Sequence, residues 1–394
     1  MQCGLHSRDA GGPPVTAVAK DVERPRAGAK VPPEDADVVV LGMLPPPVTG
    51  ASKNTQLMVD EVVGQGVRTA ALSTSVGASA LERSAAYHLK RGLHFLHTSA
   101  ALRRGGANRP HDPTLYMVPD GGSGIIYSAA YLKLARRRYA HVLLHHRTFL
   151  YIDRPNRWMR AICSDLVGKI THVFLSDGMR QRFQASYGEQ PSLIVGNARY
   201  VRPLTGTKSS DTLVLGHLSN LSAAKGFDEA ASTFEALRTV GLPVKLVLAG
   251  PVADQATRSA LERLLARHPD AVEYLGPTYG EAKDEFYRRI HLFLFPTRWP
   301  QEAQPNVVYE AFAGGAAVVA YGRGSIPEMV PANLGLVIPP EADFVAEAVP
   351  YIRAFWECRE AAPTLTHFHA EVEDQARIAQ AQHERLLATL VRTV

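Results

Sequence analysis

Short apolar segments alternate with helical segments through most of this chain, and no other feature of the sequence restricts the fold as strongly. In the first half the apolar segments are "ADVVVLG", "RTAALS", "TLYMV", "HVLLH", "HVFLS" and "SLIVG". Most of them read as continuous apolar runs, which is typical of strands buried on both faces. Strands that alternate with helices in this way predict a parallel sheet covered by helices on both faces.

A second series of strands begins after the polar segment "PLTGTKSSD". It runs through "TLVLGHL", "VKLVLAG", "VEYLG", "HLFLFP", "AAVVAYG" and "LGLVIP". The chain has 394 residues, which exceeds the size at which one hydrophobic core keeps growing. We therefore expect an α/β protein with two doubly wound, Rossmann-like domains. Ligands of such sheets bind beyond the carboxyl ends of the strands, so two facing sheets would enclose a cleft.

The same patterns predict where the domains begin and end. Residues 1–35 are rich in Gly, Ala, Pro and charge without apolar periodicity, which predicts a disordered tail. We expect the first domain at 36–200, a linker at 201–211 and the second domain at 212–366. The last segment, 367–394, is predicted to form one long closing helix.

Composition narrows the function classes. No apolar run approaches the roughly 20 residues of a membrane-spanning helix, and the sequence is not expected to begin with a signal peptide. The net charge of +5 suits an anionic small ligand or a negatively charged surface, and it is too weak and scattered to indicate nucleic acid. Cys3, Cys163 and Cys358 lie far apart without a CxxC pair, so neither a disulfide framework nor a zinc site is indicated. A cytoplasmic protein with at most peripheral membrane association is the expectation.

Basic clusters occur at Arg103–Arg104 and Arg136–Arg138. We interpret both as solvated helix faces. The first domain shows no obvious amphipathic basic helix, which favours a soluble partner for that domain.

The segment "RWPQEAQPNVVYEAFAGG" contains the most informative carboxylates. Glu302 lies in the loop after a strand, and Glu310 lies about one turn into the following helix. Pro305 suits the first turn of that helix, and the amides of Asn306 and Val307 would be free there to receive a diphosphate. A carboxylate accepts two hydrogen bonds, so the two glutamates could hold the hydroxyls of a sugar and a ribose. The alternative is a helix-start glutamate beside an ordinary surface glutamate.

A related strand–loop–helix unit, "LVLGHLSNLSAAKGFDEA", places Lys225 at a helix entrance. A lysine there can neutralise a departing diphosphate. "YLGPTYG" adds a turn at Gly276 and Pro277, where a nucleotide base could lie. Loop residues that can donate to phosphate oxygens are Ser219, Asn220 and Ser222.

Three segments of the first domain contain candidate ligand contacts. Thr49 and Gly50 follow the first strand, and a glycine lets the backbone approach a ligand closely, although a stiff proline turn explains them equally well. Asp120, in "VPDGGSG", could bind an acceptor hydroxyl or accept a proton, and a simple turn explains its glycines equally well. His145 and His146 stand at a strand end. The acceptor-side role stays open between Asp120 and these histidines.

This ordered set of motifs resembles the retaining GT-B glycosyltransferases of family four, also called group 1. The resemblance covers roughly residues 36–394. It rests on the E-x7-E pair in "PQEAQPNVVYEAFAGGAAVVAYGRGSIPEMV", on Lys225 in "AAKGF", on "YLGP" before "EFYRRIHLFLFPT", and on "LPPPVTGAS". It implies that Glu302 contacts the donor sugar, Glu310 holds the ribose and Lys225 binds the diphosphate.

One departure from the family pattern concerns the diphosphate. An arginine usually precedes the lysine by several residues, and Asn220 occupies its place here. Arg298, in the Arg298–Gln304 loop that also carries Glu302, is a candidate substitute. The loop residue Gln304 is a further donor-binding candidate.

The resemblance implies a retaining, front-face transfer of a sugar from a nucleoside diphosphate, most often uridine or guanosine diphosphate, to a hydroxyl acceptor. The acceptor could be a glycan, a lipid-linked sugar or a small metabolite. No acidic pair of the DxD type stands at a strand end, so we expect neither a metal nor another cofactor. Two alternatives are a sugar-nucleotide epimerase of the same fold and a catalytically inactive nucleotide-sugar-binding protein.

Overall fold

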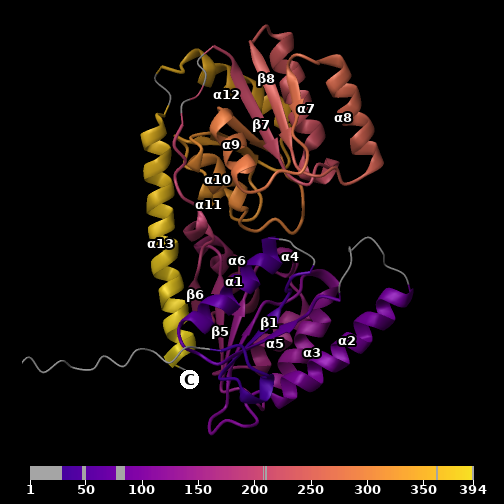
Figure 1. Cartoon of the computed structure of the whole chain (residues 1–394), viewed down its shortest axis with the longest axis vertical. Coiled ribbons are helices and arrows are strands. Elements are labelled where there is room, and N and C mark those ends of the chain that lie inside the picture. Colours follow the sequence, from indigo (N-terminus) through magenta and orange to yellow (C-terminus); the bar gives the residue numbers. More distant parts are fainter. Residues whose placement is uncertain are drawn as a thin grey trace, which may run out of the picture.

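The computed structural model describes residues 29–46, 50–76, 85–206, 208, 211–360 and 363–392, which form two α/β domains stacked along the long axis of the molecule (Figure 1). Each domain is built on one six-stranded sheet in which all neighbouring strands pair in parallel. All twelve predicted strands are present, so the predicted fold class is confirmed.

The first sheet has the strand order β2-β1-β3-β4-β5-β6. Its strands are β1 (Val38–Gly42), β2 (Thr69–Ser73), β3 (Thr114–Met117), β4 (His141–His145), β5 (Ile170–Phe174) and β6 (Ser192–Ile194). The helices between them are α1 (Gly50–Gly64), α2 (Ala85–Arg104), α3 (Ile125–Ala135), α4 (Leu150–Asp153), α5 (Arg157–Asp165) and α6 (Asp177–Tyr187). Three short 3-10 helices are η1 (Pro33–Asp35), η2 (Gly122–Gly124) and η3 (Ala198–Tyr200).

Side chains alternate between the two faces of this sheet, and each face has its own core. Val39 and Leu41 of β1 pack into a cluster with residues of α2, α3, α5 and α6. Val38 and Val40 face the other way and pack with α1 and with the last helix of the chain. The strands are therefore buried on both sides, as their continuous apolar runs predict.

The second sheet has the order β12-β11-β10-β7-β8-β9. Its strands are β7 (Leu213–Leu218), β8 (Val244–Ala249), β9 (Val272–Tyr274), β10 (Leu292–Phe295), β11 (Ala317–Tyr321) and β12 (Gly335–Ile338). Its helices are η4 (Ala223–Lys225), α7 (Phe227–Thr239), α8 (Gln255–Arg267), α9 (Glu281–Arg289), α10 (Asn306–Ala313), α11 (Ile326–Met329) and α12 (Phe344–Glu357). The direction of strand order reverses between β7 and β10, which is where doubly wound sheets open a ligand crevice.

Helix α13 (Leu365–Arg392) runs along one side of both domains (Figure 1). Phe368 and Val372, in its first half, belong to the core of the second domain. Leu386 and Leu390, in its last turns, pack against the first sheet. The predicted closing helix therefore joins both domains through apolar contacts.

The disordered tail predicted for residues 1–35 extends too far along the chain, because structure begins before residue 35. Residues 1–28 lie outside the described residues, but Lys30 already forms a bridge with Thr69 beside β2, and η1 follows at Pro33–Asp35. Backbone pairing orders this segment although its side chains show no apolar periodicity. No helix in the described part of the chain combines the length and apolar composition that crossing a bilayer requires.

Candidate active site

The loops after β7 and β10 meet at the strand-order reversal of the second sheet. Gly226, after η4, has a φ of +85°, and a Cβ at this position would lie 2.4 Å from the Pro296 carbonyl oxygen. The Arg298 N–H donates to the Ala224 carbonyl at 2.9 Å, which joins the two loops a second time. A glycine is required here because the β10 loop occupies the space of a side chain.

This contact brings Lys225 and Glu302 together. The Lys225 Nζ lies 2.5 Å from Glu302 Oε2, and the two side chains retain exposed fractions of 21% and 14%. The Trp299 ring lies on another side of the ammonium group, with its centroid 5.6 Å from Nζ. The predicted lysine and first glutamate are thus one charge pair at the edge of the sheet, able to reach a ligand that carries both phosphate oxygens and hydroxyls.

Helix α10 begins beside this pair. Pro305 is the N-cap residue of this helix, with φ −72° and ψ 120°. It therefore precedes the first turn, in which we predicted it to lie. Its carbonyl accepts a bond from the Val308 N–H at 3.2 Å. The N–H groups of Asn306 and Val307 have no acceptor in the described chain, as expected for the first residues of a helix. An open helix start of this kind favours an anion.

Glu310 is held from a neighbouring helix. Lys283 of α9 donates to its Oε1 at 2.6 Å, and the Tyr287 hydroxyl donates to its Oε2 at 3.1 Å. Burial, together with the adjacent Glu310 charge, raises the pKa of Tyr287 well above its ordinary value, so this hydroxyl stays a donor. Neither Lys283 nor Tyr287 was predicted, because their helix is far from Glu310 in the sequence.

His217, near the end of β7, contacts both β10 and the loop that follows β7. Its Nδ1 lies 2.9 Å from the Leu294 carbonyl oxygen, and its Nε2 lies 3.0 Å from the Ser219 Oγ. Burial lowers the pKa of this histidine to about 4, with Lys225 acting in the same direction. The neutral ring must donate from Nδ1 to the carbonyl, so Nε2 accepts the Ser219 hydroxyl proton. The Ser219 hydroxyl therefore donates to His217 in this structure, whereas we predicted that it would donate to a phosphate oxygen.

Asn220 is exposed beside this loop. The guanidinium of Arg298 donates to Glu229 at 3.1 Å and to the Pro340 carbonyl at 3.1 Å, and it also bonds the Tyr321 hydroxyl. These contacts use the Arg298 side chain elsewhere in the second domain. Its position therefore does not favour Arg298 as the replacement for the arginine that is missing at 220.

Gly276 and Pro277 lie after β9, two strands from β7 in the sheet. Gly276 has a φ of +72°, and its carbonyl accepts from the Gly250 N–H at 2.7 Å and from the Thr278 hydroxyl at 2.8 Å. The turn is therefore well anchored at the carboxyl edge of the sheet, as predicted for this motif.

Gln304 occupies the domain junction. Its side-chain Nε2 donates to the Leu175 carbonyl at 3.0 Å, and its Oε1 accepts from the Asn197 N–H at 2.6 Å. Both ends of the amide are used by backbone groups of the first domain. The donor-binding role that we predicted for the Gln304 side chain is therefore wrong.

His146 is likewise a core residue. Its two ring nitrogens contact the Tyr151 hydroxyl at 2.9 Å and His172 Nδ1 at 2.8 Å, and its ring stacks on Phe174. Burial and the nearby His172 keep the pKa of His146 well below its ordinary value. A fully enclosed, fully bonded ring cannot reach an acceptor, so the catalytic prediction for His146 is wrong.

His145 and Asp120 differ in their access to ligand. His145 is buried, with Nδ1 2.5 Å from the Tyr116 hydroxyl, and its Nε2 has no partner in the described chain. Asp120 follows β3 and keeps 21% of its side chain exposed, with Arg91 Nη2 at 3.4 Å. Burial raises the pKa of Asp120 to about 6, and the Arg91 charge opposes this shift. Of these two candidates, Asp120 is the one that solvent reaches.

The β1 loop is only partly described. Thr49 lies outside the described residues. Gly50 is the first residue of α1, and a Cβ there would meet nothing within 4 Å, so no contact within the described residues demands a glycine. Among the described residues, no group of His, Cys, Asp and Glu side chains is arranged to hold a metal ion.

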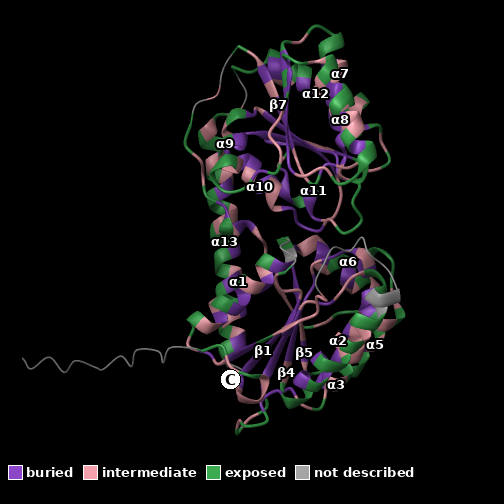
Figure 2. Cartoon of the chain, turned by 45° about the vertical axis from the view of Figure 1, so that its right-hand side comes forward, coloured by how far each residue is buried: buried purple, intermediate pink, exposed green. Residues whose placement is uncertain are grey.

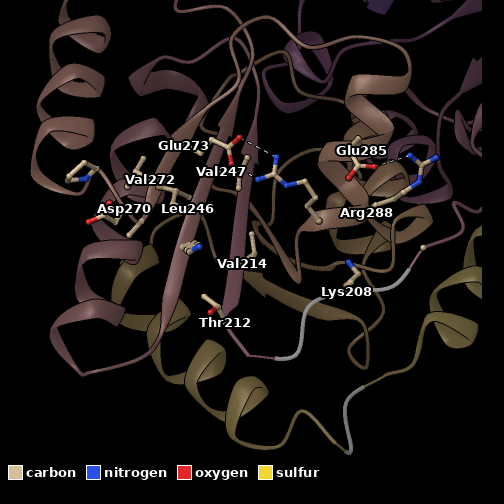
Figure 3. A pocket seen from close by; sticks show the side chains of 15 residues that line it. Lys208, Thr212, Val214, Leu246, Val247, Asp270, Val272, Glu273, Glu285 and Arg288 are labelled. Atoms are coloured by element: carbon tan, nitrogen blue, oxygen red, sulfur yellow. Dashed lines mark hydrogen bonds and ion pairs between the residues drawn. The ribbon is translucent and has the colours of Figure 1, made fainter.

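A large cavity of about 650 Å³ lies at the opposite end of the second sheet (Figure 3). It is lined by residues at or beside the starts of β7, β8 and β9, including Thr212, Lys245 and Val272. Its Arg288 pairs with Glu285 at 3.3 Å. Because the Lys225–Glu302 pair lies at the other ends of these strands, this cavity is separate from the candidate active site.

Known proteins share the part of the second domain that carries these residues. Residues 212–353, which include Lys225, Glu302 and Glu310, match the family model described as Glycosyl transferases group 1. The gpi3 subunit of phosphatidylinositol N-acetylglucosaminyltransferase from Schizosaccharomyces pombe is 27% identical over 154 residues, which are 39% of this chain and 33% of that protein. The chain thus matches about a third of the length of this curated relative.

Two solved structures resemble nearly the whole chain. Anabaena Alr3699/HepE in complex with UDP has a TM-score of 0.62 at 15% identity, covering 90% of this chain and 100% of the other. Sucrose-phosphate synthase from Thermosynechococcus elongatus has a TM-score of 0.65 at 14% identity, covering 90% and 99%. This is the GT-B fold. The family match falls on the second domain, and the structural likeness extends the shared fold to the first domain.

Proposed function

We propose that this chain is a retaining glycosyltransferase that moves a sugar from a nucleoside-diphosphate sugar to a hydroxyl acceptor. The observation that carries the proposal is that Lys225, Glu302 and the open start of α10 meet where the second sheet reverses its strand order. The group 1 glycosyltransferase match over residues 212–353 contains all three and supports transfer chemistry.

In this proposal the diphosphate lies over the start of α10, where the Asn306 and Val307 N–H groups donate to its oxygens. Lys225 neutralises the charge that develops on the leaving phosphate, and Glu302 orients the sugar hydroxyls beside it. The 2.5 Å contact between the two side chains lets one donor molecule meet both at once. Neither a metal nor another cofactor takes part.

The transfer itself is a front-face displacement. The bond from the sugar anomeric carbon to the diphosphate oxygen breaks, and the acceptor oxygen bonds to that carbon from the same face. The acceptor proton passes to the departing phosphate oxygen, so the products are a glycoside of retained configuration and a nucleoside diphosphate. Closure of the cleft would exclude water and suppress donor hydrolysis.

The nucleoside end of the donor belongs, in this proposal, between α9 and α10. Glu310 would hold the ribose hydroxyls, with Lys283 and Tyr287 fixing its carboxylate, and the Gly276–Pro277 turn would border the base. We propose a uridine diphosphate donor ahead of a guanosine one, because the similar HepE structures are complexes with UDP and UDP-glucose.

On the acceptor side we assign Asp120 to the hydroxyl, since it is the accessible candidate at the end of β3. A glycan, a lipid-linked sugar and a small metabolite are all compatible with this assignment. The gpi3 relative is a subunit of phosphatidylinositol N-acetylglucosaminyltransferase, which supports testing lipid alcohols among the acceptors. A cytoplasmic location is part of the same proposal.

The decisive test separates donor binding from transfer. Glu310→Gln should weaken the affinity for UDP or UDP-glucose by about tenfold or more, because a charge-assisted hydrogen bond to the ribose is lost. Lys225→Ala should slow transfer by a factor of about 10²–10³ with a smaller effect on donor affinity, because its charge matters most as the bond breaks. Thermal shift with nucleotides measures the first effect, and single-turnover transfer to an acceptor panel measures the second.

Glu285→Gln, on the exposed side of α9, is the matched control and should behave like the wild type. Unchanged donor affinity and rate in both site variants would sink the assignment. Epimer formation from a nucleotide sugar without acceptor would indicate the epimerase instead. Nucleotide-sugar binding without turnover across the panel would indicate an inactive binding protein.

A further inference from the structure

The outer side of α2 carries an apolar stripe that the described part of the chain leaves uncovered. Leu89, Leu93 and Leu96 are 67%, 60% and 63% exposed, and their spacing of four and three residues places them on one side of the helix. The opposite side already packs into the protein through the buried Ala101 and Leu102. The three leucines therefore contribute nothing to the described core.

Two apolar grooves flank this region. Helices α5, α3 and α2 lie side by side on one face of the first sheet (Figure 1). A groove of about 650 Å³ between α2 and α3 is lined by Phe95, Leu96 and Leu134 among others. A second, of about 290 Å³ between α3 and α5, is lined in part by Ile126 and Trp158. Exposed residues continue along these helices in Figure 2.

The charge carried by α2 and by α3 with the three arginines that follow it has a single sign, while Glu34, Asp120 and Asp165 on neighbouring segments pair with some of these cations. Residues 85–104 and 125–138 contain eight lysines and arginines and no aspartate or glutamate, whereas the whole chain has 43 basic and 38 acidic residues. Five of these eight cations have no carboxylate partner in the described chain: Lys90, Arg103, Lys133, Arg137 and Arg138, of which Arg138 donates to the Gly105 carbonyl.

From the sequence we interpreted the two arginine clusters as solvated helix faces and expected no amphipathic basic helix in the first domain. A leucine stripe on a helix normally faces the core, so its outward direction is visible only once the packing is known. In the structure the apolar stripe and the basic residues share the outer surface of the first domain.

We propose that this α2–α3 face docks on an anionic lipid bilayer. A protein surface docked on a membrane places its exposed leucines at the boundary between headgroups and acyl chains, while its basic residues meet lipid phosphates. An anionic bilayer supplies both the apolar layer and the negative charge that this surface lacks. Docking does not depend on the transfer chemistry proposed above.

The position of the face bears on substrate access. Arg91, in the first half of α2, lies 3.4 Å from Asp120, so the leucine stripe begins beside the carboxyl edge of the first sheet. A docked protein would hold the Asp120 side of the cleft next to the membrane surface. An acceptor hydroxyl on a lipid headgroup could then enter the site without leaving the bilayer.

The test is co-sedimentation of the full chain with vesicles. Phosphatidylcholine vesicles are compared with equimolar phosphatidylcholine–phosphatidylglycerol vesicles at low and at physiological salt. Leu93→Gln with Leu96→Gln should weaken binding to the anionic vesicles by about tenfold or more, since both variants remove apolar groups from the interface. Arg103→Glu with Arg137→Glu should do the same, because each cation near an anionic surface contributes about fivefold.

Matched controls lie elsewhere on the surface. Leu57→Gln with Val240→Gln alters exposed apolar residues outside the face, and Arg258→Glu with Arg263→Glu makes the same charge change on α8. Both pairs should bind as the wild type does, and thermal unfolding checks that every variant is folded. No binding of the wild type to anionic vesicles, or equal binding of patch and control variants, would overturn the proposal. A wild-type dimer that Leu93→Gln with Leu96→Gln converts to a monomer, without vesicle binding, would overturn it in favour of a second copy of the chain.

Discussion

Gly226 determines how closely the two loops of the candidate active site approach. Its positive φ strains any residue with a side chain, and its contact with the Pro296 carbonyl leaves no room for a Cβ. The neighbouring Lys225 reaches Glu302 only because this approach is possible. A single backbone position thus controls the geometry of a charge pair 77 residues apart in the chain.

Gly226→Ala should therefore lower the free energy of unfolding by more than backbone strain alone would. Gly241→Ala is the matched control, since Gly241 has a φ of +83° but nothing within 4 Å of its Cβ position. We expect Gly241→Ala to destabilise by about 1–2 kcal/mol from backbone strain, and Gly226→Ala to exceed it by about 1–3 kcal/mol from overpacking. Urea unfolding measures both, and equal losses would show that the Pro296 contact relaxes freely.

His217 should make the protein sensitive to acid. Its folded pKa of about 4 lies below the ordinary 6.5, so the unfolded chain binds the extra proton and stability falls as pH drops below 6.5 towards 4. Between pH 7 and pH 5 the wild type should lose about 1–2 kcal/mol more than His217→Gln does. Urea midpoints at the two pH values test this, and parallel losses in both proteins would contradict it.

At the scale of elements, α13 holds the two domains together with different surfaces at its two ends. Phe368 and Val372 belong to the second domain, while Leu386 and Leu390 are fully buried against the first. Glu61 of α1 adds a polar contact, since its carboxylate accepts from Arg199 at 2.6 Å and lies 2.9 Å from His383 of α13. Burial raises the pKa of Glu61, but the hydrogen bonds to His383 and Arg199 and the Arg199 charge lower it overall to about 2.

Leu386→Ala should loosen the first domain selectively. The cavity is expected to cost about 2–5 kcal/mol, because a fully buried leucine is truncated. Hydrogen exchange should rise in α1 and β1 and stay unchanged in β7 and β8. Val391→Ala, at a position 40% exposed on the same helix, should change neither region. Faster exchange in both domains would mean that α13 stabilises the molecule as a single unit.

At the scale of the whole molecule, specific hydrogen bonds at the domain junction add to the apolar contacts of α13. Glu328 of α11 accepts from the Ser176 hydroxyl at 2.7 Å and from the Gly178 N–H at 2.9 Å, at the start of α6 in the first domain. Gln304 adds the bonds to Leu175 and Asn197. These bonds join α11 and the Gln304 loop of the second domain to the first domain, so they help to set how the two sheets face each other.

Glu328→Ala should shift the molecule towards more open arrangements. Two bonds to the first domain are lost, including a carboxylate at a helix N-terminus, which together stabilise by about 1–3 kcal/mol. Small-angle scattering without nucleotide should show a larger radius of gyration than the wild type. Glu341→Ala, at an exposed position in the second domain, should not. An identical profile for Glu328→Ala would place the control of domain orientation in α13 instead.

Much of the fold could be predicted from the sequence because buried parallel strands carry their own signal in continuous apolar runs. The glutamates, Lys225 and, to within one residue, the helix start at Asn306 were also readable, since all of them lie in a loop that follows a strand or in the helix after it. Lys283 and Tyr287 were not, because nothing local links them to Glu310. His146 and Gln304 were misassigned because polar residues near strand ends look alike in sequence whether they face a cleft, a core or a junction.

The sequence by itself therefore determined the order of strands and helices, the two-sheet architecture and the set of residues at the carboxyl ends of the strands, since these depend on local periodicity. Only the tertiary structure decided which of those residues meet. In the tertiary structure Lys225 pairs with Glu302 and His146 is buried. Gln304 bonds across the domain junction, and the leucines of α2 face outward. Each outcome depends on contacts between segments far apart in the chain, and such contacts follow from packing rather than from any local pattern.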